Sequence, residues 1–272
     1  MSLVSEIKAS LSSPRAKRVL PYVGIVLLIL IAVVAIYSIA VTPSRAPYRH
    51  ALAKYQLVYK ANVDFSAAGA NMGASQATNE QFTKNVQKTR DALELLKNEA
   101  AGLGKQEVLT SGEGKILYDA FYEKLQAYTT YNADMLDSIE QARPVLFECQ
   151  GLSNVSEDAA SVAVLNDCAK KFKALDTLAN DDYEQLIQRF QTLYTDLAKN
   201  IGQAAALKDP QGKDKARYTT YVEERTQLIN DLGEAATTLT KNLRLHLAEV
   251  DITELSKALD DYLTKQSNIF SF

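Results

Sequence analysis

The chain has 272 residues, of which 47% are hydrophobic and 23% are charged, and its net charge at pH 7 is −3. It contains only 11 glycines and 6 prolines. This composition excludes a disordered or collagen-like chain, and the acidic balance argues against a nucleic-acid partner.

An uncharged apolar run covers residues 19–41. As a helix it would be roughly 34 Å long, enough for a hydrocarbon core of ~30 Å. We therefore expect one transmembrane anchor helix over residues 19–41. The run is longer than the core of a signal peptide, yet Ser38 and Ala40 also fit the rule for a cut after Ala40, so cleavage stays open.

Basic residues flank the run on both sides, but Arg15, Lys17 and Arg18 lie directly before it. Short basic tails are retained in the cytoplasm. We expect residues 1–18 to form a short basic cytoplasmic tail and residues 43–272 to form an extracytoplasmic domain. The tail holds four basic residues and one acid, so the charge of −3 for the whole chain leaves −6 for the domain.

The domain has the pattern of an all-α protein. No stretch alternates with the period of a strand, whereas apolar residues recur at spacings of three and four, the pattern of antiparallel helix packing. The sequence predicts an elongated antiparallel bundle of about five or six helices over residues 47–74, 82–103, 118–146, 165–204, 218–250 and 253–266.

The first helix should pack through a face marked by Tyr48, Leu52, Tyr55, Tyr59 and Asn62. After it, residues 66–75 are nearly all small. This segment either breaks the chain between two helices, or continues the first helix where another helix approaches closely, or lines a ligand groove.

Cys149 and Cys168 are the only cysteines, and they flank the connection before the fourth helix. In an oxidising compartment they are expected to form a disulfide, whereas in a cytosolic domain they would be two unpaired buried thiols. If the fourth helix begins at Ser156, Cys168 lies three turns into it. The third helix would then end below the tip of its partner, or residues 157–165 would form a separate short helix.

No catalytic, metal-ligating or cofactor-binding residue is predicted. The histidines, His50 and His246, belong to no metal or catalytic motif, and His246 is expected as a core or boundary residue. Adjacent acids such as Asp181 and Asp182 point about 100° apart on a helix, which is typical of a solvated face. We expect a non-enzymatic protein without a cofactor.

Two groups of residues are candidates for recognition. The tyrosines of the third helix could form an interaction surface or pack at bundle boundaries: Tyr118, Tyr122 and Tyr131. Polar residues at apolar positions could fix the helix register, line a small cavity or mark a bend in the packing: Asn62, Asn132 and Arg225.

These features predict a single-pass protein of the cell membrane, with its N-terminus in the cytoplasm and its helical bundle outside. The expected role is protein–protein interaction or structural assembly in the cell envelope, with an envelope or surface protein as partner. The alternative is an extracytoplasmic domain that binds a small ligand and signals through a separate membrane partner. The sequence predicts no oligomeric state.

Overall fold

A computed structural model describes residues 45–70, 79–150, 156–175 and 177–268. All regular secondary structure within these ranges is helical, which confirms the all-α bundle. None of the helices in these ranges combines the length and the apolar character needed to cross a membrane. The predicted tail, the anchor over 19–41 and the cut after Ala40 lie outside the described residues.

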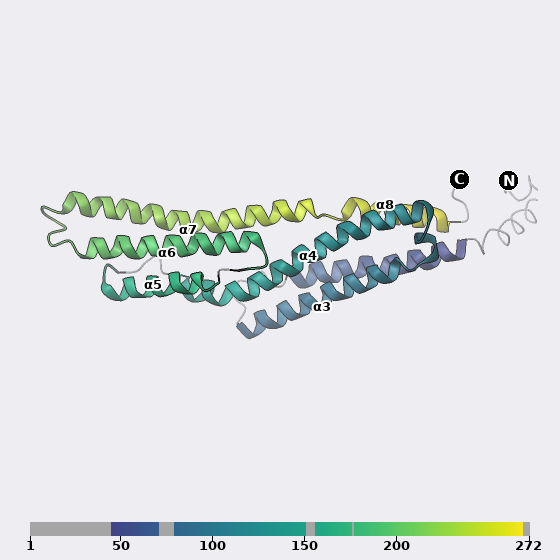
Figure 1. The fold of residues 1–272 in the computed structure, drawn as a ribbon, viewed down its shortest axis with the longest axis horizontal. Helices are drawn as coiled ribbons and strands as arrows, with labels where there is room; N and C mark the ends of the chain where they lie inside the picture. The colour runs from purple at the N-terminus through teal and green to yellow at the C-terminus, as the bar shows by residue number, and fades with distance from the viewer. Residues whose placement is uncertain (1–44, 71–78, 151–155, 176, 269–272) are drawn as a thin grey trace, which may run out of the picture.

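The described chain forms one helix after another, and Figure 1 shows them arranged as a long rod. In chain order the elements are helix 45–70, α3 (Asn79–Leu103), the 3-10 helix η2 (Glu107–Leu109), α4 (Gly112–Cys149), α5 (Ala159–Lys173), α6 (Asp181–Ala205), α7 (Lys215–Glu249) and α8 (Thr253–Ser267).

One end of the rod, the base bundle, consists of residues 45–70, 79–130 and 253–267. Its core joins helix 45–70, α3, α4 and α8, with Leu96, Phe121 and Leu259 fully buried. Both ends of the described chain lie here (Figure 1): the rings of Tyr48 and Tyr262 are 6.1 Å apart, and Arg49 Nε donates to the carbonyl of Ser267 at 3.4 Å.

The other end, the tip bundle, consists of residues 131–249. Its core is built from the second half of α4 with α5, α6 and α7. Phe172 packs there against the rings of Phe190 and Tyr194, at 5.6 and 5.2 Å. At 38 residues α4 is ~57 Å long and runs through both bundles. Between the two cores its Leu136 packs against Phe65 and Leu93 of the base bundle.

The structure corrects the predicted fourth helix, which is not continuous over 165–204. The chain instead forms α5 and α6, which pack against each other. Asn180 ends the connection as the N-cap of α6, where its side chain accepts from the backbone N–H of Tyr183. Asp181, Asp182 and Glu184 follow in the first turn, where the helix dipole favours acids. These polar residues start a new helix although the apolar spacing continues through them.

The structure also corrects the predicted start of the helix that contains Cys168 and part of the predicted packing face of helix 45–70. The N-cap of α5 is Asp158, whose carboxylate accepts from the N–H of Ser161 at 2.7 Å, and not Ser156. In helix 45–70 the predicted Tyr55 is buried, and Tyr48 and Leu52 pack against the base core. The packing face continues through Ala51, Val58 and Phe65, so the predicted Tyr59 is 59% exposed. Residues 66–70 continue this helix, while the rest of the ambiguous segment 66–75 lies outside the described residues.

Candidate functional site

A polar cluster lies where the base bundle meets the tip bundle. It consists of Tyr131 from α4, Asp182 from the first turn of α6 and His246 from the last turn of α7. His246 Nδ1 lies 2.7 Å from Asp182 Oδ2, and the Tyr131 hydroxyl donates to the same oxygen at 3.4 Å. The rings of Tyr131 and His246 meet edge to face at 6.0 Å. The cluster thus joins three helices through one carboxylate.

The Asp182 side chain is only 3% exposed, whereas the imidazole of His246 is 44% exposed. A buried carboxylate needs a partner, and it finds one in the imidazole and the phenol. The hydrogen bond to Asp182 raises the pKa of His246 above its ordinary value of 6.5, and the charges of Glu249 and Asp181 act in the same direction. The contact is therefore strongest when His246 is protonated.

This contact should make the stability of the protein depend on pH. Because the pKa of His246 is raised on folding, its contribution is complete below about 6.5 and is lost as the pH rises through the raised value. The groove around the imidazole also holds Tyr131 and Asp134, and the charges of Asp182, Glu249 and Asp181 all favour the protonated form of His246. The difference in unfolding free energy between the wild type and His246→Gln, from urea titrations, should be larger at a pH of about 5.5 than at about 8.5.

His50→Gln serves as the matched control, since His50 is exposed on helix 45–70. It should change the unfolding free energy little at either pH. Equal destabilisation by His246→Gln at both values would show that the proton on His246 does not strengthen the contact.

Two grooves adjoin the cluster, with Asp182 in the lining of both. One, of about 270 Å³, lies between α4, α6 and α7 and carries Asp134, Asp181 and Glu249. The other, of about 330 Å³, lies between α6 and α7, where Arg189 Nη2 pairs with Asp231 Oδ2 at 3.1 Å. Polar and apolar surface contribute about equally to both grooves, and among their charged residues acids outnumber bases.

The structure separates the three tyrosines predicted as an interaction surface. Tyr118 is buried, its hydroxyl donates to the carbonyl of Ala100 at 3.0 Å, and its ring stacks on that of Tyr122 at 5.4 Å. Burial and neighbouring charges raise the pKa of Tyr118 to about 12. Tyr122 and Tyr131 are half-buried, one in the base bundle and one in the junction cluster. Tyr118 is therefore a core residue, and the three do not form one exposed surface.

The polar residues predicted in the packing faces lie on three different helices and make separate contacts. Asn132 is buried and donates to the carbonyl of Tyr128 in its own helix at 2.8 Å. Arg225 pairs with Glu157 at 2.7 Å, which fastens α7 to the start of α5. Asn62 lies on helix 45–70, where its side-chain oxygen is buried without a hydrogen bond from the described residues. Asn132 and Arg225 thus satisfy internal contacts and line neither groove beside Asp182.

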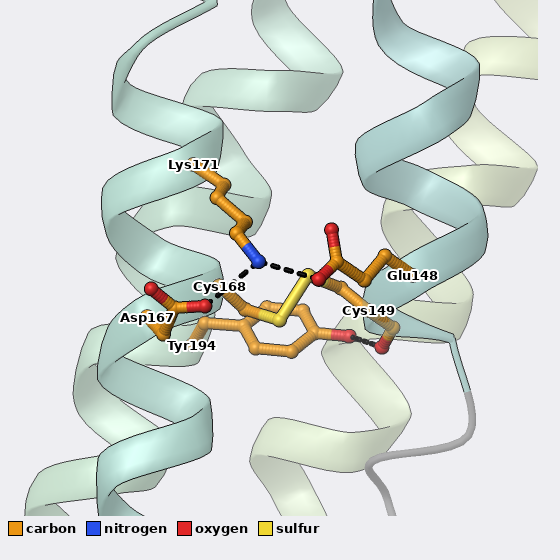
Figure 2. The surroundings of a disulfide bond; sticks show 6 residues. All are labelled: Glu148, Cys149, Asp167, Cys168, Lys171 and Tyr194. Carbon is orange, nitrogen blue, oxygen red and sulfur yellow. Dashed lines mark hydrogen bonds and ion pairs between the residues drawn. A yellow bond between two sulfur atoms is a disulfide. The ribbon is translucent and has the colours of Figure 1, made fainter.

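The predicted pairing of Cys149 with Cys168 is present, as Figure 2 shows. The bond joins the last residue of α4 to α5, with Cα atoms 5.9 Å apart. Tyr194 from α6 donates to the carbonyl of Cys149 at 2.6 Å, and Lys171 bridges Glu148 and Asp167 beside the bond. The separate helix α5, longer than the short helix considered over 157–165, allows Cys168 to reach the end of α4.

One signal in the sequence points to Asp182. Asn180 followed by two acids is typical of the start of a helix. On a helix that begins beside α4, the second of these acids, Asp182, points inward, whereas two adjacent acids alone suggest a solvated face.

No three or more His, Cys, Asp or Glu side chains of the described residues are arranged to hold a metal ion. Comparison with protein-family models, with curated proteins and with solved structures finds no match to this chain.

Proposed function

We propose that this chain is a single-pass membrane protein that holds a helical rod outside the cell membrane, where it acts in protein interaction or assembly of the envelope and not as an enzyme. The observation that carries the proposal is the position of the two ends of the described part of the chain. Residue 45 begins the base bundle only a few residues after the apolar run 19–41, and the tip lies at the opposite end of the rod. A span over 19–41 would hold the base near the bilayer and the tip away from it.

The internal contacts support a structural role for the polar residues. Asn132, Arg225 and Tyr118 are each engaged within the bundle, and the junction cluster joins α4, α6 and α7. The disulfide supports placement outside the cytoplasm, since disulfides persist in oxidising compartments. With the basic residues before the run, this favours a cytoplasmic N-terminus.

Membrane insertion and orientation can be measured with two single-cysteine additions. Thr220→Cys places a thiol on the exposed surface of α7, and Ser12→Cys places one in the predicted tail. A membrane-impermeant maleimide should label Thr220→Cys in intact cells and Ser12→Cys only after lysis. The chain should also stay in the pellet after alkaline carbonate extraction. Release by carbonate, or labelling of Ser12→Cys alone in intact cells, would contradict the proposal.

The partner can be sought by cross-linking the full chain in its own envelope, with identification of the captured proteins. A captured envelope or surface protein is the expected result. A reproducible enzymatic activity, lost on mutation of one named residue, would contradict the non-enzymatic role.

A second candidate function, recognition of a small ligand, is favoured by the two grooves that meet at Asp182. Their lining is acidic, so the ligand would be a cation such as an amine. A rise in the unfolding temperature with a diamine, lost in Asp182→Asn, would support this function. Unchanged unfolding temperatures across a panel of amines would count against it.

A further inference from the structure

The outward side of α7 is the least covered helix surface in the tip bundle. α7 packs on α6 along one side, and none of its 35 residues is buried. Away from α6 lies a row of exposed residues that we term the α7 outer face: Glu223, Thr226, Asn230, Thr237, Lys241 and Arg244. Their spacings of 3, 4, 7, 4 and 3 are the same in both directions along the helix.

The charges of the α7 outer face have no partner in their own helix. Other helices pair their surface charges at four-residue spacing, as Lys60 does with Asp64. Glu223 has only threonines and a glutamine at the reachable positions, and Lys241 lies three residues from the like charge of Arg244. Among the described residues none of these three charges forms an ion pair within 4.0 Å. Glu223 and Lys241 are roughly 27 Å apart along the helix, too far to meet.

We propose that the α7 outer face binds the same face of a second copy of this chain, with the two α7 helices antiparallel. A two-fold axis between residues 233 and 234 places Glu223 opposite Arg244, Thr226 opposite Lys241 and Asn230 opposite Thr237 of the other copy. A two-fold interface repeats each contact, so the ion pair between Glu223 and Arg244 forms twice. A parallel arrangement would instead place like charges against each other. The antiparallel arrangement also brings the two exposed Glu234 side chains together beside Gly233 at the axis. It nevertheless forms two ion pairs where the parallel arrangement forms none, so charge complementarity favours the antiparallel dimer.

Gly233 lies at the centre of this arrangement and is exposed. No heavy atom lies within 4 Å of the place where its Cβ would be, so nothing inside the chain requires a glycine there. Glycine is a poor helix former, but it lets two helix backbones approach closely. A contact along α7, ~52 Å long and ~10 Å wide, would bury roughly 1,000 Å² over both copies, the lower end for a specific dimer. The complex should therefore be reversible and sensitive to salt.

The geometry has a consequence for the proposed membrane attachment. The base bundles of an antiparallel pair point in opposite directions, so their residue-45 ends lie at opposite ends of the dimer. If the span over 19–41 is inserted as proposed above, the dimer would link two facing membranes. This consequence rests on the proposed anchor, whereas dimerisation through α7 does not.

The test uses the full chain in detergent, with the dimer dissociation constant measured by analytical ultracentrifugation. Glu223→Arg and Arg244→Glu should each weaken the dimer by at least about tenfold, because each creates two like-charge contacts. The double variant should regain an affinity within about threefold of the wild type, because it restores both pairs in reversed order. Glu123→Arg, an equal charge change on the exposed side of α4, should leave the affinity unchanged.

A second readout does not depend on charge. Asn230→Cys mixed with Thr237→Cys should give an intermolecular disulfide under mild oxidation, while neither variant alone should do so. Gly233→Gln should abolish the dimer without lowering the unfolding temperature. A chain that stays monomeric at every accessible concentration, a dimer insensitive to Glu223→Arg, or no rescue by the double variant would overturn the proposal. Carbonate extraction tests the anchor separately, so failure of the proposed dimer does not imply failure of the proposed membrane anchor, and the reverse also holds.

Discussion

Replacement of both Cys149 and Cys168 by serine is expected to lower the free energy of unfolding by about 3 kcal/mol. The bond closes a loop between positions 19 apart, and its loss increases the conformational freedom of the unfolded chain. In a chain of this size such a loss corresponds to a fall of about 6–12 °C in the unfolding temperature. Circular dichroism during heating of the full chain in detergent measures it.

The control for this variant is the wild type heated with and without reductant. Both sulfurs belong to buried residues, 1% and 3% exposed, so the reductant should act slowly until the tip bundle opens. Once reduced, the wild type should unfold at the temperature of the double serine variant. Equal unfolding temperatures for oxidised wild type and the double variant would mean that the bond contributes nothing to stability.

Phe172→Ala is expected to destabilise the protein by about 3–5 kcal/mol. Phe172 is 1% exposed on α5 and contacts the rings of Phe190 and Tyr194, so its removal leaves a cavity in the centre of the tip core. Urea denaturation followed by circular dichroism gives the free energy directly.

Val164→Ala on the same helix is the matched control, since Val164 is 46% exposed and should cost little. Phe121→Ala removes the equivalent ring from the base core. Because α4 contributes to both cores, both phenylalanine variants should shift one shared transition. A separate early transition in Phe172→Ala, with the later one unchanged, would show that the two bundles unfold independently.

Helix type and the main packing faces follow from the spacing of apolar residues. Phe82, Leu96 and Leu103 of α3 are buried as their spacing predicts, because large apolar side chains dominate the free energy of burial. The packing face of helix 45–70 was harder to predict, because its core positions include Ala51 and Ala61. Such small residues contribute little to a hydrophobic pattern. Tyr59, a large side chain at the spacing of the face, was therefore predicted to pack although it is exposed.

The break between α5 and α6 could not be predicted from apolar spacing. Spacings of three and four continue from Phe172 to Tyr183, so periodicity alone cannot show that the chain reverses there. Only the capping chemistry of Asn180 and the three lysines at the end of α5 indicate the ends of two helices. The junction cluster could not be predicted, because His246 and Asp182 are 64 positions apart and meet only after this reversal.

The continuity of α4 through both cores determines how the rod responds to force. A pull between the base and the tip acts along the helix axes, so the side-chain contacts along the rod are loaded in shear and many must fail together. A pull between residue 45 and residue 268, which lie at the same end, would separate helix 45–70 from α8 one contact at a time. The same fold is thus mechanically strong when stretched from end to end and weak when unzipped from its base.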